Sequence, residues 1–197
     1  MNVVIIKYNA GNIYSVDYGL KRLGITPTIT DDKAIIQTAD KVIFPGQGEA
    51  KSTMEYLTYH QLDKLIVELK QPVLGICIGM QLMCKYSEEG NTKCLGIFDT
   101  EVKRFISGNK YDKIPHMGWN TLTNIQGNLI PNELENESVY FVHSYYVPVN
   151  VQTIATTEYI QPFSAALNKD NFYATQFHPE KSGRIGEKIL KNFIESV

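Results

Sequence analysis

The sequence predicts an α/β protein built on an open, mostly parallel sheet flanked by helices, with an added antiparallel part in its C-terminal half. Short apolar segments at 3–6, 41–44 and 73–76 have strand character and alternate with segments of helical periodicity. This alternation is typical of a parallel sheet that helices cover on both faces. The turn-rich second half is more typical of antiparallel strands.

The predicted elements of the N-terminal half follow a regular order. After the strand at 3–6, a loop at 8–12 leads into a helix that Gly24 ends. Its apolar residues recur at helical spacing, at Ile13, Val16, Leu20 and Leu23. We then expect a strand at 26–30, a short helix near 32–38 and the strand at 41–44. The next amphipathic helix, marked by Leu62, Leu65, Ile66 and Leu69, precedes the strand at 73–76.

The C-terminal half is more polar and predicts shorter elements. Residues 87–113 are rich in turn formers, with possible strands at 95–98 and 101–105. We expect antiparallel strands at 139–142, 152–157, 164–168 and 172–177, the last two joined by a turn at 168–171. A helix at 186–194 closes the chain, with Ile189, Leu190, Phe193 and Ile194 facing inward. No repeat or linker divides the sequence, so we expect one domain at 1–197.

The overall composition excludes several classes of function. A net charge of −2, with no basic cluster, argues against a broad nucleic-acid or membrane-surface role. The N-terminal residues enter a strand pattern directly, without a basic leader. Three cysteines at unrelated spacings fit neither a disulfide framework nor a zinc site. We therefore expect a cytoplasmic protein without a metal and without nucleic-acid or membrane partners.

Cys77 is the first candidate for chemistry, because it stands between the strand at 73–76 and a run of helix formers at 80–83. Gly75 and Gly79 flank it, and a strand that turns abruptly into a helix needs such residues where backbones approach closely. Partial positive charge at the helix start favours a thiolate. The alternative is a small buried hydrophobic residue, which is the usual state of a lone cysteine.

His178 and Glu180 provide a base and a carboxylate near the end of the chain. Residues two apart on a strand face the same side, so we expect these two side chains to project together, with Pro179 marking the strand end. A thiol nucleophile requires such a base and a group that orients it. The alternative for His178 alone is a structural histidine.

A glycine loop at 45–48 follows the predicted strand at 41–44. Two glycines one residue apart let backbone N–H groups turn toward a ligand, although glycine turns are common and weak evidence by themselves. Beside the Cys77 turn, Gly46, Gln47 and Gly48 become a candidate oxyanion hole, with the N–H of Ile78 as the partner donor.

Together these residues resemble the class I, or triad-type, glutamine amidotransferases. The family marks are a P-G-x-G loop, a G-x-C-x-G-x-Q turn and a late H-P-E, which stand here in that order at 45–48, 75–81 and 178–180. The resemblance covers 1–197. It implies a flavodoxin-like amidotransferase fold, a Cys77–His178–Glu180 triad that hydrolyses L-glutamine through a γ-glutamyl thioester, and no cofactor.

Further segments narrow the resemblance to the glutaminase subunits of imidazole glycerol phosphate synthases. Residues 115–120, 140–145 and 176–183 are similar to that group, and 8–16 resembles the family's opening segment. The glutaminases of anthranilate synthase, GMP synthetase, CTP synthetase and pyridoxal-phosphate synthase lack the 115–120 and 140–145 pair. The implied partner is a (β/α)8-barrel cyclase subunit, in a heterodimer that makes imidazole glycerol phosphate and aminoimidazole carboxamide ribotide for histidine biosynthesis.

The resemblance also implies roles for residues outside the triad. Gln81 and the backbone of Ser144 and Tyr145 would hold glutamine. Candidates for the partner interface are Asn12, Trp119, Asn120, Tyr140 and Lys181. For Trp119 the alternative is a core aromatic residue, and for Lys181 a solvated surface lysine.

Two positions in or near the glycine loop depart from the family pattern. The family usually has Val and an aromatic residue in P-G-V-G-x-F, where this chain has Gln47 and Ala50. Because the oxyanion donor is backbone, we expect the chemistry to survive that difference. The alternative functions are a glutaminase of another amidotransferase complex, a free-standing γ-glutamyl hydrolase, and a non-catalytic member of the fold, which would have lost a triad residue.

Overall fold

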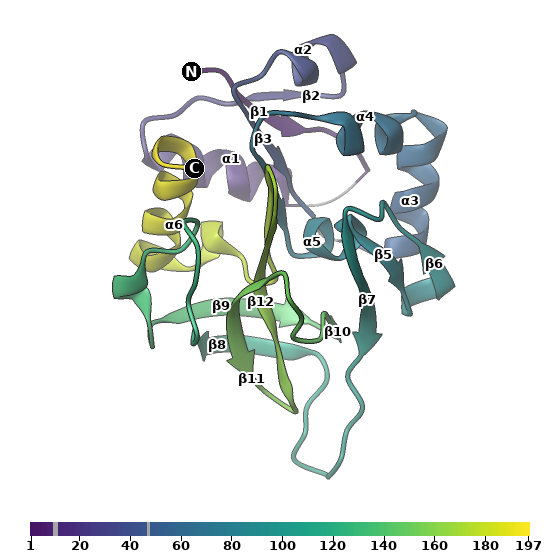
Figure 1. The fold of residues 1–197 in the computed structure, drawn as a ribbon, viewed down its shortest axis with the longest axis vertical. Helices are drawn as coiled ribbons and strands as arrows, with labels where there is room; N and C mark the ends of the chain where they lie inside the picture. The colour runs from purple at the N-terminus through teal and green to yellow at the C-terminus, as the bar shows by residue number, and fades with distance from the viewer. Residues whose placement is uncertain (10–11, 47) are drawn as a thin grey trace.

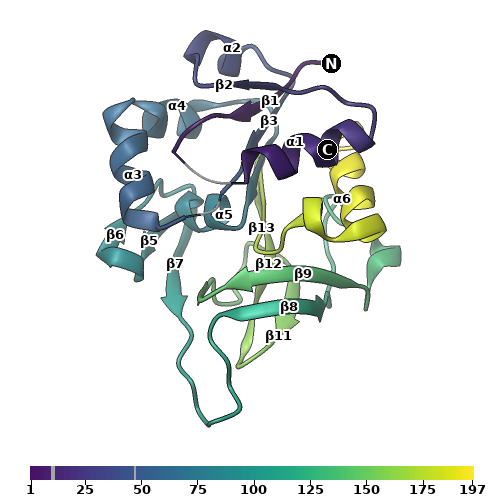
Figure 2. The ribbon, with the colours of Figure 1, turned by 180° about the vertical axis from the view of Figure 1, so that it is seen from behind.

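A seven-stranded sheet forms the centre of the molecule in a computed structural model that describes residues 1–9, 12–46 and 48–197 (Figures 1 and 2). Its strand order is β11-β12-β13-β4-β3-β1-β2. The bounds are β1 Val3–Ile6, β2 Thr28–Thr30, β3 Lys41–Phe44, β4 Val73–Ile76, β11 Thr153–Glu158, β12 Pro162–Lys169 and β13 Phe172–Thr175. The strands from β2 to β13 are parallel, whereas β11, β12 and β13 pair antiparallel. The predicted fold class is confirmed.

Helices cover both faces of this sheet. They are α1 Ile13–Arg22, α2 Lys33–Gln37, α3 Ala50–Tyr59, α4 Leu62–Glu68, α5 Ile78–Met83 and α6 Gly183–Glu195. Helices α1 and α6 lie on one face and α3 and α4 on the other (Figures 1 and 2). Within the described ranges no helix is long and apolar enough to cross a membrane.

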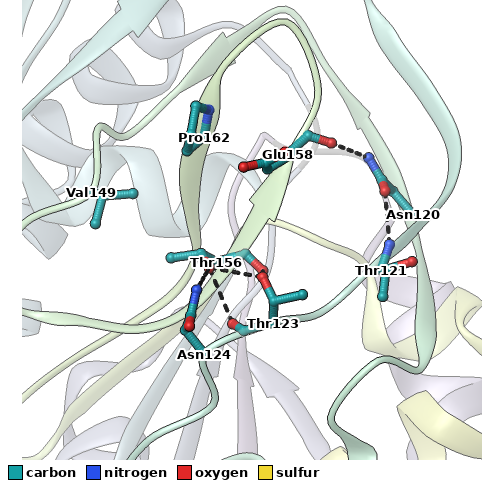
Figure 3. Close-up of a pocket in the computed structure, with 8 residues that line it drawn as sticks. All are labelled: Asn120, Thr121, Thr123, Asn124, Val149, Thr156, Glu158 and Pro162. Atoms are coloured by element: carbon teal, nitrogen blue, oxygen red, sulfur yellow. Dashed lines mark hydrogen bonds between the residues drawn. The ribbon is translucent and has the colours of Figure 1, made fainter.

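Two smaller sheets extend the C-terminal half. A four-stranded sheet has the order β10-β7-β5-β6, formed by β10 Tyr145–Tyr146, β7 Phe98–Arg104, β5 Cys84–Ser87 and β6 Thr92–Lys93. Strands β8 His116–Thr121 and β9 Ser138–His143 form an antiparallel pair. A surface hollow of about 650 Å³ lies where β8 meets β11 and β12, lined in part by Asn120, Thr156 and Glu158 (Figure 3).

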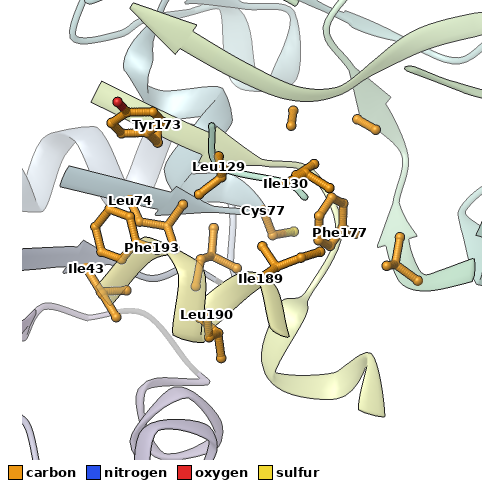
Figure 4. Packing of buried hydrophobic residues seen from close by; sticks show 14 of the residues in the cluster. Ile43, Leu74, Cys77, Leu129, Ile130, Tyr173, Phe177, Ile189, Leu190 and Phe193 are labelled. Carbon is orange, nitrogen blue, oxygen red and sulfur yellow. The ribbon is translucent and has the colours of Figure 1, made fainter. Parts of the chain in front are cut away.

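Hydrophobic residues of the central strands alternate between the two faces, as side chains of a strand must. Val3 and Ile5 belong to the cluster under α1 and α6, and Val4 and Ile6 to the cluster on the opposite face. The predicted inward residues of α6 are all buried, namely Ile189, Leu190, Phe193 and Ile194. Figure 4 shows the first cluster, to which Cys77 also belongs.

Several elements differ from the sequence prediction. Helix α3 and strand β8 were not predicted, because α3 buries only Ala50, Thr53 and Leu57 and β8 has a single buried residue, His116. The possible strand at 95–98 is wrong, since the second sheet uses Phe98–Arg104 instead. Strand β13 is antiparallel to β12 as expected, but its other edge pairs parallel with β4. It therefore belongs to the central sheet.

Candidate active site

Cys77 occupies a strained turn between β4 and α5. Its backbone has φ 55° and ψ −109°, a conformation that L-residues rarely adopt and that costs on the order of 1–3 kcal/mol. The flanking glycines leave no room for side chains. A Cβ at Gly79 would lie 2.2 Å from the Phe44 carbonyl oxygen, and one at Gly75 would lie 2.8 Å from the Met83 sulfur. Close packing around the turn thus accounts for both glycines.

The glycine loop packs directly on the first turn of α5. A Cβ at Gly46 would lie 1.8 Å from the Ile78 side chain and 2.7 Å from the Gly79 nitrogen. Gly48 has φ 151° and lines the same pocket as Cys77. Gln47 lies outside the described residues. The loop therefore adjoins the free N–H groups of a helix start.

Tyr8 is a residue of this region that the sequence prediction missed. Its buried hydroxyl donates a hydrogen bond to the Pro45 carbonyl, and its ring packs against Phe44 at 5.4 Å between centroids. Burial raises the pKa of Tyr8, and the negative charge of a Cys77 thiolate raises it further. Tyr8 thus remains a neutral donor that holds the start of the glycine loop.

Strand pairing brings the histidine to the cysteine. Thr175 of β13 pairs with Ile76 of β4, and the Cys77 N–H donates to the Thr175 carbonyl at 2.8 Å. His178 follows β13 by three residues and lines the same pocket as Cys77. Its Nδ1 lies 2.7 Å from Glu180 Oε1, with both side chains buried.

The sequence prediction that strand alternation brings His178 and Glu180 together is wrong. His178 and Glu180 do not share a strand, because β13 ends at Thr175 and Pro179–Lys181 forms a short 3₁₀ helix, η3. The tight turn of η3, rather than strand alternation, folds the carboxylate back onto the imidazole. The Ser182 hydroxyl donates to the His178 carbonyl at 2.7 Å and holds this turn.

The electrostatics of His178 favour its charged form. Burial lowers the pKa of this imidazole, but the neighbouring Cys77 thiolate and the Glu180 carboxylate outweigh burial and raise the pKa to about 10. Nδ1 donates to Glu180, and Nε2 has no hydrogen-bond partner among the described residues. The imidazolium form of His178, with its Nε2–H free among the described residues, is therefore the favoured state of this side chain.

Asn12 lies in this cluster rather than on an outer surface. Its side-chain amide donates to Glu180 Oε1 at 2.5 Å. Asn12 is the residue before α1 and has φ 74°. Arg22 of α1 also reaches the same segment, with its guanidinium 3.3 Å from the Glu180 carbonyl oxygen. Residues at both ends of α1 thus hold the Glu180 segment in place.

A pocket of about 260 Å³ collects most of the predicted site residues. Its lining consists of Gly48, Cys77, Ile78, Gln81, Glu89, Pro115, Val142, His143, Ser144, Tyr145 and His178. Gly46 packs behind Ile78. Gln81 is buried, and its amide nitrogen donates to the Tyr145 carbonyl at 3.0 Å and to Gln176 Oε1 at 2.9 Å. The Gln81 nitrogen therefore holds the pocket wall.

Glu89 is a second lining residue that the sequence prediction missed. Its Oε2 accepts a hydrogen bond from the Ala50 N–H at 2.8 Å. Burial raises the pKa of Glu89, the Ala50 hydrogen bond lowers it, and the Glu49 charge raises it, with a net upward shift. A partly buried carboxylate at a pocket wall can bind a cation such as an ammonium group. No charge pattern in the sequence around 89 distinguishes this residue from its acidic neighbour.

The other interface candidates lie on β8, β9 and η3. Trp119 on β8 is 58% exposed and packs edge-to-face on Tyr140 of β9 at 6.1 Å between centroids, so it is not a core aromatic residue. Lys181 is half-buried in η3. Asn120 donates to the Glu158 carbonyl at 2.8 Å, at the edge of the surface hollow (Figure 3).

The other two cysteines are poorly suited to act as nucleophiles. Cys84 is the first residue of β5, and burial raises its pKa well above the ordinary value. Burial, with the charge of Glu89, also raises the pKa of Cys94 to about 12. Among the described residues no group of His, Cys, Asp and Glu side chains is arranged to hold a metal ion.

Comparison with known proteins gives a consistent result. The family model described as glutamine amidotransferase class-I matches residues 4–197. Imidazole glycerol phosphate synthase subunit HisH of Bacteroides fragilis (strain YCH46) is 64% identical over 195 residues, covering 99% of this chain and 100% of that protein. The protein of the same name from Yersinia pseudotuberculosis is 46% identical over 197 residues, covering 99% and 100%.

A solved structure shows the same fold at much lower identity. A putative GMP synthase protein from Thermoplasma acidophilum superposes with a TM-score of 0.73 at 20% identity. The match covers 98% of this chain and 92% of that one.

Proposed function

Because this chain belongs to the class I glutamine amidotransferases, we propose that it is the glutaminase subunit of an imidazole glycerol phosphate synthase. The relatives that are 64% and 46% identical to it, each matched over its whole length, are named imidazole glycerol phosphate synthase subunit HisH. The reaction is hydrolysis of L-glutamine to glutamate and ammonia. The observation that carries the proposal is the strained Cys77 turn facing an imidazole whose other nitrogen is bonded to Glu180.

The first half-reaction is attack by the Cys77 thiolate on the side-chain amide carbon of glutamine. The carbonyl oxygen becomes an oxyanion, which accepts hydrogen bonds from the Ile78 N–H and from the glycine loop at 46–48. The Nε2–H of His178 then protonates the departing nitrogen, ammonia leaves, and a γ-glutamyl thioester remains. Glu180 and Asn12 keep the imidazole oriented through this transfer.

The second half-reaction is hydrolysis of the thioester. His178, now neutral, takes a proton from water as the water oxygen attacks the thioester carbon. The carbon–sulfur bond breaks, glutamate leaves, and the thiolate–imidazolium pair is restored. No step requires a metal or an organic cofactor, since the thiolate and the imidazole supply the nucleophile and both proton transfers.

The pocket wall suits the amino-acid end of glutamine. We assign the α-ammonium to the Glu89 carboxylate and the α-carboxylate to backbone N–H groups at Ser144 and Tyr145, all of which line the pocket. Gln81 acts indirectly, by holding the pocket wall, since its amide nitrogen already donates to Tyr145 and Gln176. This arrangement places the substrate amide over Cys77.

We propose that the ammonia passes to a (β/α)8-barrel cyclase subunit, which binds this chain as a heterodimer, because free ammonia in water would be protonated and lost. The surface around Trp119 and Tyr140 supports this assignment, since exposed aromatic residues are enriched at interfaces. Residues 1–197 would act as one amidotransferase domain. Three free thiols suit a reducing cytoplasm.

The test is co-expression of the chain with a (β/α)8-barrel cyclase subunit of an imidazole glycerol phosphate synthase, followed by co-purification and an ammonia-transfer assay. The proposal requires a stable complex that forms imidazole glycerol phosphate from glutamine. Steady glutamine hydrolysis with no complex would instead assign a free-standing γ-glutamyl hydrolase. Absence of any glutaminase activity in a verified complex would exclude the catalytic proposal altogether.

A further inference from the structure

Two buried histidines outside the triad contact each other beside the active site. His116 of β8 and His143 of β9 are 3% and 5% exposed, and His116 Nδ1 lies 3.1 Å from His143 Nε2. His143 Nδ1 lies 2.7 Å from the Tyr145 carbonyl oxygen. The His116 ring stacks on Phe141 and Tyr159 at 4.9 and 4.0 Å. The glutaminase chemistry described above does not use either imidazole.

The hydrogen bonds determine where each proton lies. A carbonyl only accepts, so His143 must carry its proton on Nδ1 and leave Nε2 as an acceptor. His116 must then donate from its own Nδ1. Its Nε2 is left to accept from the Asn120 amide, 3.3 Å away, whose other N–H donates to Glu158 at the surface hollow (Figure 3). Both rings are thus Nδ1–H tautomers.

A second set of side chains continues from Tyr145 to the nucleophile. The Tyr145 carbonyl accepts from Gln81 as well as from His143, which uses both of its lone pairs. Gln81 also donates to Gln176, and the Gln176 amide lies 3.8 Å from Cys77 Sγ in donor geometry. An N–H aimed at the sulfur stabilises a thiolate more than a thiol.

From this continuous series of hydrogen bonds we infer that His116 and His143 are positioning residues for Cys77. As two neutral Nδ1–H imidazoles they fix the Tyr145 carbonyl, and through Gln81 and Gln176 they fix the amide that faces the sulfur. The inference rests on the proposed function, because it takes Cys77 as the nucleophile.

Charge considerations agree with the tautomer assignment. Burial lowers the pKa of His116 to about 4 and that of His143 to about 3, the latter against the hydrogen bond to Tyr145 and with help from the charges on His116 and His178. Both rings are therefore neutral at physiological pH. A proton added to His143 Nε2 would face the His116 N–H and break the hydrogen bond between the two rings.

The first test is nitrogen NMR of the full chain labelled with ¹⁵N-histidine. The sequence has four histidines, and exposed His60 supplies a reference signal. We expect His116 and His143 to show a protonated Nδ1 and an unprotonated Nε2 throughout pH 5.5–8. An Nε2–H tautomer at either ring, or fast exchange between tautomers, would overturn the inference.

The second test compares two substitutions that separate positioning from packing. His116→Phe keeps the stacked ring and removes the donor, whereas His116→Asn loses the ring and keeps an N–H near the Nδ1 position. We expect alkylation of Cys77 by iodoacetamide, and kcat in the complex, to fall about tenfold in His116→Phe. In His116→Asn the alkylation rate and kcat should both lie within about threefold of wild type.

The free energy of unfolding should be lower in His116→Asn than in His116→Phe, since His116→Asn loses the aromatic packing. Activity that follows stability, with His116→Asn below His116→Phe, would reduce His116 to a packing residue and overturn the inference. His60→Phe is the matched control and should change nothing. Alkylation requires no glutamine, so a Cys77 that is no more reactive than Cys84 in wild type would reject the proposed function instead.

Discussion

Thr175 of β13 pairs in parallel register with Ile76 of β4, and this pairing brings the two sides of the candidate active site together. Both strands lead directly into catalytic candidates, Cys77 one residue later and His178 three residues later. The Cys77 N–H donates to the Thr175 carbonyl, so the pairing continues to the edge of the pocket. The carboxyl ends of adjacent parallel strands are the common location for sites in such sheets.

Close contact across the Cys77 turn predicts that Gly79 is irreplaceable. In Gly79→Ala the new Cβ would lie 2.2 Å from the Phe44 backbone oxygen, so β3 or α5 must move. We expect a stability loss of about 1–3 kcal/mol and loss of most glutaminase activity. Chemical denaturation and turnover measure both. Gly108→Ala, whose Cβ would meet only a side-chain oxygen at 3.5 Å, should behave like wild type.

The three cysteines should differ sharply in their importance. Cys77→Ala should abolish glutamine-dependent synthesis while the complex still uses added ammonia, because the proposed function puts the acceptor site on the partner. Cys84→Ser and Cys94→Ser should retain turnover, since both thiols are buried with raised pKa values. Parallel assays with glutamine and ammonium salts measure this. Substantial glutaminase turnover in Cys77→Ala would show that another residue is the nucleophile.

The groups around the imidazole should have graded effects. His178→Ala should remove nearly all turnover, because thiolate stabilisation and leaving-group protonation both depend on it, whereas Glu180→Gln should leave more. Both losses should be on the order of 10³-fold or greater. Asn12→Ala should cost less than Glu180→Gln, since Asn12 only supports the carboxylate. Wild-type rates in Glu180→Gln would remove Glu180 from the triad.

Acid should destabilise the protein through His116 and His143. Their folded pKa values of about 4 and 3 lie below the unfolded value of about 6.5, so below pH 6.5 the unfolded chain binds more protons. Their stabilisation is present above pH 6.5 and is lost as pH falls toward 4. His178, with its pKa raised to about 10, stays protonated in the folded chain, so its stabilisation grows as pH falls from 7 through the unfolded pKa and offsets part of that loss.

Linkage gives the magnitude of that acid effect. Between pH 7 and 5.5 we expect a loss of slightly more than about 1 kcal/mol from each of His116 and His143 and a gain of slightly less than about 1 kcal/mol from His178, a net loss of about 1–2 kcal/mol. Urea denaturation at the two pH values measures it, and His116→Phe should lose less than half as much, because the gain from His178 remains. An unchanged stability, or an equal loss in the variant, would show that these histidines titrate alike in the folded and unfolded chain.

Sequence was most informative where short-range geometry decides the structure. The Cys77 turn and the glycine loop each lie within a few residues, and their steric needs appear as glycines at 46, 75 and 79. Strand β13 was expected beside β12, but nothing local shows that its other edge pairs with β4, about 100 residues earlier. Long-range pairing of this kind depends on the whole fold.

Residues that support the site from a distance were harder to predict. His116 and His143 stand 27 positions apart, and a buried histidine pair leaves no pattern in its neighbours. Asn12 was assigned to the interface by the family resemblance, and its contact with Glu180, 168 positions away, has no local signal in the sequence. Tyr8 and Glu89 face the site through single side chains, which composition and periodicity cannot distinguish from ordinary loop residues.

The central claim, a glutaminase controlled by a synthase partner, is tested most directly by glutaminase kcat in three states. These are the isolated subunit, the complex, and the complex with acceptor ligand. One oxyanion donor is worth about 3 kcal/mol, or ~10²-fold in rate, and a partner that completes the hole need supply only that difference. The account predicts a low kcat alone and a rise on adding partner and acceptor. Equal kcat values in all three states would contradict it and leave a constitutive hydrolase.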